Sequence, residues 1–310
     1  MRSRPKDGML LMCSERCHNL SGETMGTARW HAQFWLPEGA DPSPYQSAFQ
    51  KAVDTVDAQM SLWKPQSDLC RLNAAAVGEW VTVPAALFTV LDQALTIGRL
   101  SGGAFDIAVG RAVQAWGFGP KPTDADHLTQ MIGDTSHITA HDAVELDAEG
   151  LRVRKNHPVQ LDLNGIAKGY GTDCLIDTAR RLGVTSICAG IDGDLRAIGT
   201  KPDGGFWPIA VEAPDYDRRA IHSVVEVTDV AVATSGDYRH WITVGDKRLS
   251  HTINPRQGIP LTDGPASVTV LDETCMAADA WATALMVMGK EAGTHFARAN
   301  GIKAMYLERT

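Results

Sequence analysis

The sequence predicts an α+β protein in which mainly antiparallel sheets pack with helices in a single compact unit. Three observations support this prediction: two amphipathic helices are indicated before residue 100, short β-rich segments fill residues 185–271, and an apolar helix follows them. A βαβ repeat would instead alternate strands with helices along the whole chain. No Pro/Ser-rich linker and no repeat period divides the 310 residues.

Four segments before the β-rich region have clear patterns. Residues 44–61 place apolar side chains at steps of four, three and four, which is typical of a helix that buries one face. A second helix over 84–100 opens at a proline and ends before a Ser-Gly-Gly sequence. Residues 143–162 alternate around a glycine turn, which predicts a hairpin, and residues 165–183 predict a helix that stops at a glycine.

The β-rich region consists of six short segments separated by Gly, Pro or Asp. They are residues 185–191, 194–199, 207–213, 223–234, 240–253 and 266–271. The helix predicted after them, over 277–288, is apolar apart from Asp279 and Thr283. Because a helix has about 3.6 residues per turn, a spacing of four places this carboxylate and this hydroxyl on one face.

The net charge and the N-terminal residues restrict the kinds of partner and the cellular location that we expect. The chain has 37 acidic and 29 basic residues, and the basic ones are scattered beyond the first few positions, which argues against a nucleic-acid partner. Apolar runs such as residues 9–12 are far too short to span a membrane. Residues 1–20 are predicted to be a poorly ordered leader before a domain over 21–310. Because this leader lacks a convincing export signal, we expect a cytoplasmic protein; the alternative is an exported or lipid-anchored one whose start hides a signal peptide.

Several familiar catalytic templates do not fit the sequence. No phosphate-binding P-loop and no G-x-S-x-G motif occurs, and residues 189–199 lack the helix that a dinucleotide-binding glycine motif requires. The six cysteines are dispersed, which argues against a disulfide scaffold. Polar clusters remain at the ends of the predicted elements: 22–27, 61–73, 102–110, 161–173, 234–241, 250–260 and the helix over 277–288.

In their order and spacing, these clusters resemble the ApbE family of FAD:protein FMN transferases. The resemblance implies a single ApbE-like, T-fold-like unit. It also implies an enzyme that uses Mg²⁺ and takes FAD as its substrate. Such an enzyme attaches the FMN half of FAD to a Thr or Ser hydroxyl of an acceptor flavoprotein and releases AMP. Two alternatives remain open: a Mg²⁺-dependent FAD pyrophosphatase that gives FMN and AMP, and a non-catalytic FAD-binding protein.

The resemblance assigns the metal site to Asp279, Thr283 and the backbone carbonyl of Ala167. Carboxylate, hydroxyl and carbonyl oxygens suit Mg²⁺, whose remaining positions are filled by waters and phosphate oxygens. The residues alone also allow a structural interpretation. In that case Asp279 favours the start of the helix through its dipole, and Thr283 bonds back to the preceding turn.

The resemblance also implies FAD-binding residues on four segments, namely Met25; Trp63; Ala104, Phe105 and Asp106; and Asn164, Lys168 and Tyr170. A thioether and an indole suit contact with an aromatic ring system. Asp106 would accept from ribityl or ribose hydroxyls, and Lys168 would add positive charge where a helix N-terminus favours phosphate. The structural alternatives are plain core packing, a helix cap and a solvated lysine.

His251 is the candidate catalytic residue, since it matches the family's histidine in an H-x-x-D-P-x-x-G stretch. An imidazole near the phosphate would take the proton of the acceptor hydroxyl as that oxygen attacks phosphorus. The alternative is a polar surface residue of a strand. Ile253 is expected against the flavin ring or the adenine. Residues 234–241 are expected to form a hydrogen-bonding turn beside the pyrophosphate, in which residues 234–236 match family positions.

Three positions depart from the family's usual residues. Gly190 stands where the family has Asn, Asp192 where it has Gly, and Asn254 where it has Asp before a proline. Asp192 would add a charge that repels phosphate if it pointed inward. None of the three changes Lys168 or the predicted metal ligands.

Overall fold

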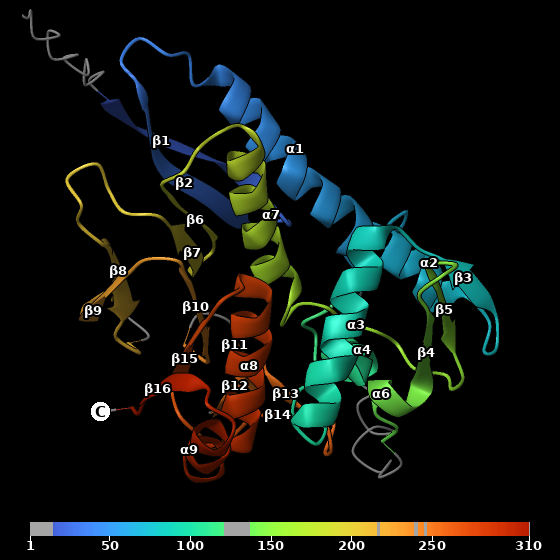
Figure 1. Cartoon of the computed structure of the whole chain (residues 1–310). Helices are drawn as coiled ribbons and strands as arrows, with labels where there is room; N and C mark the ends of the chain where they lie inside the picture. Colours follow the sequence, from blue (N-terminus) through green and yellow to red (C-terminus); the bar gives the residue numbers. More distant parts are fainter. Residues whose placement is uncertain (1–14, 121–136, 216–217, 239–240, 245–246, 310) are drawn as a thin grey trace, which may run out of the picture.

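The computed structural model describes residues 15–120, 137–215, 218–238, 241–244 and 247–309. Its main element is a seven-stranded sheet in the order β1-β2-β6-β7-β10-β15-β16, in which all neighbouring strands are antiparallel (Figure 1). The strands are β1 (Glu15–Thr24), β2 (Ala28–Pro37), β6 (Ile187–Ile191), β7 (Asp194–Ile198), β10 (Val230–Gly236), β15 (Ser267–Asp272) and β16 (Lys303–Leu307).

Strand β2 shows why these residues form a sheet. Its side chains are alternately buried and more exposed, so that Trp30 and Phe34 point into one core cluster. Phe49 and Val53 of α1 (Ser43–Met60) belong to the same cluster, and the rings of Phe34 and Phe49 meet edge to face with centroids 5.7 Å apart. Burial of this apolar face fixes α1 against the sheet.

Two helices lie in the middle of the molecule and connect the sheet to a second core. α7 (Ala167–Arg181) packs on β6 and β7, and α8 (Cys275–Met288) packs on β10 and β15. Figure 1 shows α7 and α8 in the centre, with the sheet on one side and α3 (Ala85–Leu100) on the other. The start of α7 and the start of α8 therefore lie inside the molecule, where they can carry a site.

The second core lies under α3 and a small three-stranded sheet. This sheet has the order β3-β5-β4, and its apolar side chains join those of α3 in one buried cluster. Its elements are α2 (Asp68–Ala74), β3 (Trp80–Thr82), α6 (Ala140–Ala143), β4 (Val144–Asp147) and β5 (Arg152–Lys155).

Shorter elements complete the described chain. They are η1 (Ile107–Val109), α4 (Gly110–Ala115), β8 (Trp207–Glu212), β9 (Ile221–Val227), β11 (Trp241–Val244), β12 (Lys247–Ser250), β13 (Ile253–Asn254), β14 (Ile259–Pro260) and α9 (Lys290–Ala299). The strands among them form three two-stranded sheets: β8 with β9, β11 with β12, and β13 with β14. Within the described ranges, no helix is both long and apolar enough to cross a membrane.

Helix α8 separates the two cores because apolar residues line two of its faces. Ala278 and Ala282 belong to the cluster that faces β10 and β15, whereas Ala280 and Ala284 belong to the cluster under α3. Successive helix residues are turned by about 100°, so residues 279 and 283 lie on the strip between these two faces. On that strip, Asp279 meets the start of α7 and Thr283 meets the end of β10, so both oxygen groups contact polar groups of other elements.

The predicted fold class is confirmed, together with the helices near 44–61, 84–100, 165–183 and 277–288 and the hairpin of β4 and β5. Three predictions are wrong. The segments expected over 223–234 and 240–253 are each divided, the first between β9 and β10 and the second between β11 and β12. Residues 15–20 belong to β1 and pair with β2, so the ordered part begins before the predicted boundary at residue 21, while residues 1–14 lie outside the described residues. Residues 234–236 are the end of β10, paired with β15, and not a turn.

Candidate functional site

The candidate site lies where the first turn of α7 meets the second turn of α8. The backbone N–H of Gly169, in the first turn of α7, donates to Oδ2 of Asp279 over 3.1 Å. A Cβ at position 169 would overlap the carbonyl oxygen of Cys275 and lie 2.9 Å from Cβ of Asp279. Only glycine therefore allows the two helices to come this close.

Two buried carboxylates share one lysine beside this crossing. Asp279 is 5% exposed and Asp194, at the start of β7, is 2% exposed. Lys168 donates to Oδ2 of Asp194 over 2.7 Å. Although burial opposes its charge, the negative charges of Asp194 and Asp279 raise the pKa of Lys168 above its ordinary value.

The charge balance leaves Asp279 short of positive partners. Burial first, and then the negative charge of Asp194, raise the pKa of Asp279 to about 7, although Lys168 and the N–H of Gly169 act in the opposite direction. Two carboxylates around one ammonium group leave a net negative charge in a buried place. Such a place suits an added cation.

The hydroxyl of Thr283 lies next to this carboxylate on α8. Its Oγ1 is 3.1 Å from Oγ of Ser235 at the end of β10, so the hydroxyl is directed at the sheet. A Cβ on Gly165 would lie 3.1 Å from the same Oγ1, so glycine keeps space in front of it. Ala167 is the first residue of α7. Asp279, Thr283 and Ala167 are thus brought to one junction.

The donor set at this junction fits a hard divalent cation better than a soft one. With the predicted carbonyl of Ala167, the carboxylate of Asp279 and the hydroxyl of Thr283 would make a set of ligand types that Mg²⁺ accepts together with waters and phosphate oxygens. No group of three or more His, Cys, Asp or Glu side chains that could hold a metal occurs among the described residues. The assignment of Asp279, Thr283 and Ala167 as metal ligands stays a prediction.

The structural interpretation of Asp279 loses support from the bounds of α8. The helix begins at Cys275, so Asp279 lies beyond the first turn, where the effect of the helix dipole is already small. The cap of α8 is Thr274, whose side chain accepts from the N–H of Ala277 over 3.3 Å. Asp279 is therefore not needed to start the helix.

The segment before α7 is held by its own hydrogen bonds. Asp162 accepts from the backbone N–H of Asn164 over 2.7 Å and from its side-chain amide over 3.2 Å. Burial raises the pKa of Asp162 to about 6, against the effect of these two bonds. The N–H of Ala167 donates to Leu163, so two early amides of α7 are engaged within the protein. Lys168 is therefore the main candidate for phosphate recognition at this end of α7, and this role stays a prediction.

Tyr170 belongs to the same predicted FAD-binding segment as Asn164 and Lys168, and it lies on α7 with Lys168. Tyr170 is half-buried one turn along α7, and burial raises the pKa of its hydroxyl. Met25 lies in the turn between β1 and β2 with a positive φ of 46°. Its Cε would be 3.1 Å from a Cβ on Gly171, so Met25 reaches the first half of α7. Met25 is thus close to α7, the helix that carries Lys168 and Tyr170.

Asp106 has a structural role that accounts for its position. Its Oδ1 accepts from the N–H groups of Ala108 and Ala140, each over 2.9 Å, and its Oδ2 is 2.7 Å from Nε2 of His137. The residue is 6% exposed, and Phe105 beside it belongs to the core under α3. These contacts match the alternative of a capping carboxylate, and they hold the segment that includes Ala104. Binding of FAD hydroxyls by Asp106 stays a prediction.

His251 and Ile253 lie on a segment that docks against α4. The ring of His251 faces Phe118 with centroids 6.4 Å apart. Ile253 is buried with Ala112 and Val113 of α4, so its side chain is used in packing. Arg256 donates to the carbonyl of Gly102 over 3.1 Å, which links this segment to the one that contains Asp106.

The three departures from the family pattern are accommodated locally. A Cβ at Gly190 would lie 2.5 Å from the carbonyl oxygen of Asp194, so the close pairing of β6 and β7 suits glycine here. Asp192 has a φ of 51° in the turn between these strands and is exposed at that turn. Asn254 Oδ1 accepts from the N–H of Arg256 over 3.1 Å. Asp192 nevertheless adds to the negative charge that acts on Lys168.

Trp63 differs from the other candidates because it is 62% exposed on the loop between α1 and α2. If it stacks on the flavin, Trp63→Ala should weaken FAD binding by about 1 kcal/mol or more. Fluorescence titration of FAD measures this change, and Trp80→Ala is a suitable control because Trp80 contacts Arg152 and Arg154 on the small sheet. Equal affinities of Trp63→Ala and the unchanged protein would remove Trp63 from the site.

Two buried acidic residues of this region were not predicted. Asp194 pairs with Lys168, and Asp173 of α7 accepts from the N–H groups of Cys275 and Met276 at the start of α8. The sequence did contain one indication of these residues, namely an acidic residue within an otherwise well-buried helix or strand. That signal shows that a partner must exist, but it does not show which one.

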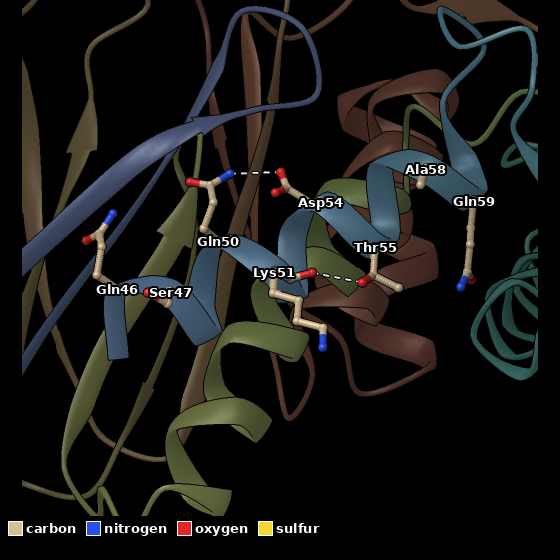
Figure 2. Close-up of a pocket in the computed structure, with 8 residues that line it drawn as sticks. All are labelled: Gln46, Ser47, Gln50, Lys51, Asp54, Thr55, Ala58 and Gln59. Carbon is tan, nitrogen blue, oxygen red and sulfur yellow. Dashed lines mark hydrogen bonds between the residues drawn. The ribbon is translucent and has the colours of Figure 1, made fainter. Parts of the chain in front are cut away.

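A hollow along α1 is separate from the candidate site. It has a volume of about 620 Å³ and is lined by Gln46, Ser47, Gln50, Lys51, Asp54, Thr55, Ala58 and Gln59 (Figure 2). Gln50 donates to Asp54 over 2.8 Å and to the carbonyl of Glu23 over 2.9 Å. None of the predicted site residues lines this hollow, and its side chains help to fasten α1 to β1.

The fold and the site define an α+β protein with a buried, charged centre between the starts of two helices. The model of the ApbE family matches residues 25–306. The FAD:protein FMN transferase of Vibrio cholerae is 37% identical over 305 residues, which cover 96% of this chain and 89% of the relative. The chain belongs to the ApbE family.

Solved structures agree with this assignment. The flavin transferase ApbE from Vibrio cholerae superposes with a TM-score of 0.83 at 35% identity, covering 96% of this chain and 95% of the other. The flavinyl transferase ApbE from Pseudomonas stutzeri, in its apo form, gives a TM-score of 0.82 at 33% identity and covers 96% and 92% of the two chains. The fold and the family that the sequence predicted are thus confirmed.

Proposed function

We propose that this protein transfers the FMN half of FAD to a Thr or Ser hydroxyl of an acceptor flavoprotein and releases AMP, with Mg²⁺ bound at Asp279. The names of the relatives support transfer of FMN from FAD to a protein. The observation that carries the proposal is the position of Lys168 beside two buried carboxylates at the junction of α7 and α8.

The transfer exchanges the phosphoanhydride bond of FAD for a phosphoester bond to the acceptor. The acceptor oxygen forms a bond to the phosphorus of the FMN half, and the bond from that phosphorus to the bridging oxygen breaks. AMP leaves with the bridging oxygen, and the hydroxyl proton must go to a base. Negative charge grows on the phosphate oxygens and on the leaving group, so the residues around them must supply positive charge.

The chain's own residues divide this work. The ammonium group of Lys168 would contact the pyrophosphate, while Asp194 keeps that group in place through the 2.7 Å hydrogen bond. Asp279, Thr283 and Ala167 would hold the metal. When bound, Mg²⁺ supplies neutralising charge to the pyrophosphate. Because the donor oxygens lie on two helices fixed by packing, they need little rearrangement to act.

His251→Ala tests the acid–base step. If His251 takes the acceptor proton, the variant should bind FAD normally while transfer slows about a hundredfold or more. The transfer rate is measured from the covalent flavin formed in samples quenched at successive times, at saturating FAD and acceptor. A separate titration measures FAD affinity. Loss of FAD binding with an intact rate at saturation would instead assign His251 to ligand positioning.

A single assay separates the possible functions. The protein is incubated with FAD and Mg²⁺, with and without an acceptor flavoprotein domain, and AMP release and flavin fluorescence on a denaturing gel are followed. We expect AMP and covalent flavin to appear together, and only when the acceptor is present. AMP and free FMN without acceptor would indicate a pyrophosphatase, whereas FAD binding without AMP would indicate a non-catalytic protein.

A further inference from the structure

We propose that Asp173 is a positioning residue that fixes the start of α8 against α7 and thereby places Asp279. The inference rests on the proposed function in that cation binding at Asp279 provides its readout. Asp173 is buried in the middle of α7 and touches none of the predicted ligand-binding groups in the described contacts. Its effect on Asp279 is therefore expected to pass through the start of α8.

The contacts of Asp173 lie at the first two residues of α8. Its Oδ1 accepts from the N–H of Cys275 and its Oδ2 from the N–H of Met276, each over 2.9 Å. These N–H groups have no partner within their own helix, so a carboxylate from another helix satisfies them. A negative charge at a helix start is also favourable. Thr274 caps only the next amide, that of Ala277.

The second link between the helices lies one turn away on each of them. Gly169 precedes Asp173 by four residues on α7, and Asp279 follows Cys275 by four residues on α8. The two helices run in opposite directions. Two hydrogen bonds connect them side by side, one from Cys275 to Asp173 and one from Gly169 to Asp279. Four residues span about 6 Å along a helix, so the two hydrogen bonds lie close together. If the start of α8 tilts at Cys275, Asp279 is displaced as well.

An arginine keeps the carboxylate of Asp173 in this position. Nη1 of Arg196 lies 2.6 Å from Oδ1 of Asp173. Arg196 and Asp194 are two residues apart on β7 and therefore on the same face of the strand. Strand β7 consequently holds both Asp173 and Lys168, and it connects the start of α8 with the lysine of the site.

This arrangement predicts a graded loss of cation affinity. Metal sites tolerate displacements of only about 0.2 Å in ligand distance, and loss of a residue that supports a ligand typically weakens binding about ten- to a hundredfold. Asp173→Ala removes both caps and should fall in that range. Asp173→Asn keeps one acceptor oxygen and should lose less.

The test uses the full chain and Mn²⁺ as the probe. The concentration of free Mn²⁺ is measured by electron paramagnetic resonance at a temperature well below the melting transition of each variant. Asp177→Ala is the matched control, because Asp177 is exposed one turn further along α7 and pairs only loosely with Arg180. We expect the unchanged protein and Asp177→Ala to bind Mn²⁺ most tightly, Asp173→Asn less tightly and Asp173→Ala most weakly. The affinity for FAD, measured in the presence of a chelator, should be the same for all four proteins.

Each other result has a definite meaning. If Asp173→Ala does not fold, Arg196→Met serves in its place, because it leaves the caps and removes only their support; a reduced Mn²⁺ affinity is then expected. A lower melting temperature with unaltered Mn²⁺ affinity in the folded variants would overturn the inference and leave Asp173 a purely structural residue. Failure of the unchanged protein to bind Mn²⁺ would overturn the proposed metal site, and the inference with it.

Discussion

Asp279→Ala should abolish AMP release and FMN transfer at all practical Mg²⁺ concentrations. The substitution removes the only anionic ligand assigned to the metal, and it leaves Lys168 with Asp194 as its main partner. Folding should be affected much less, because α8 starts at Thr274 and Cys275 and is capped by other side chains. AMP release measured against Mg²⁺ concentration, together with thermal melts, checks both parts.

Thr283→Val is the graded companion of this experiment. The two side chains are nearly equal in size, so the variant loses one oxygen ligand and the hydroxyl partner of Ser235 without a large change in volume. We expect a weakened activity that excess Mg²⁺ partly restores. An Asp279→Ala protein that melts lower, yet turns over with an unaltered Mg²⁺ response, would contradict the metal assignment and favour a structural role.

Gly169→Ala should damage both stability and metal binding. The new Cβ would overlap the backbone carbonyl of Cys275, which cannot move unless α8 moves with it. Overpacking of this kind costs about 1–3 kcal/mol, and it more than offsets the gain of about 1 kcal/mol that alanine brings inside a helix. Because α8 carries Asp279, Mg²⁺-dependent AMP release should fall sharply as well. Urea unfolding and the Mg²⁺ titration measure the two effects.

Gly171→Ala is the matched control for stability, two residues further along the same helix. Its Cβ would lie 2.8 Å from Cδ1 of Ile191 and 3.1 Å from Cε of Met25, and both are ends of flexible side chains that can turn aside. We therefore expect a much smaller change in the free energy of unfolding than for Gly169→Ala. Equal stabilities of the two variants would show that α7 and α8 are not in close contact at position 169.

The sequence predicts the parts of the fold whose pattern is local. Helix α1 was found from its apolar steps of four and three, and the β4–β5 hairpin from alternation around a glycine. Strand β2 alternates just as clearly, with Trp30 and Phe34 buried, but it was not predicted. Strand β1 could not be found in this way, because it is an outer strand with mostly exposed polar side chains and gains its order from pairing with β2.

The site could be predicted only as a set of residues without their partners. Asp279 and Thr283 were singled out because oxygen groups on an apolar helix need a reason. The sequence could not show that Gly169 faces Asp279, since the two are 110 positions apart and meet only when α7 and α8 pack. Asp106 illustrates the opposite case: its motif suggested a ligand, and folding supplied three protein donors.

The two ion pairs between α7 and β7 have opposite polarity, and this affects how the chain finds its native register. Lys168 of the helix meets Asp194 of the strand, and Asp173 of the helix meets Arg196 of the strand. If α7 docked about one turn too far in one direction, Lys168 would face Arg196. A slip in the other direction would bring Asp173 to Asp194. Either misdocked chain would enclose two like charges, so both slipped alignments carry an electrostatic cost that the native alignment avoids.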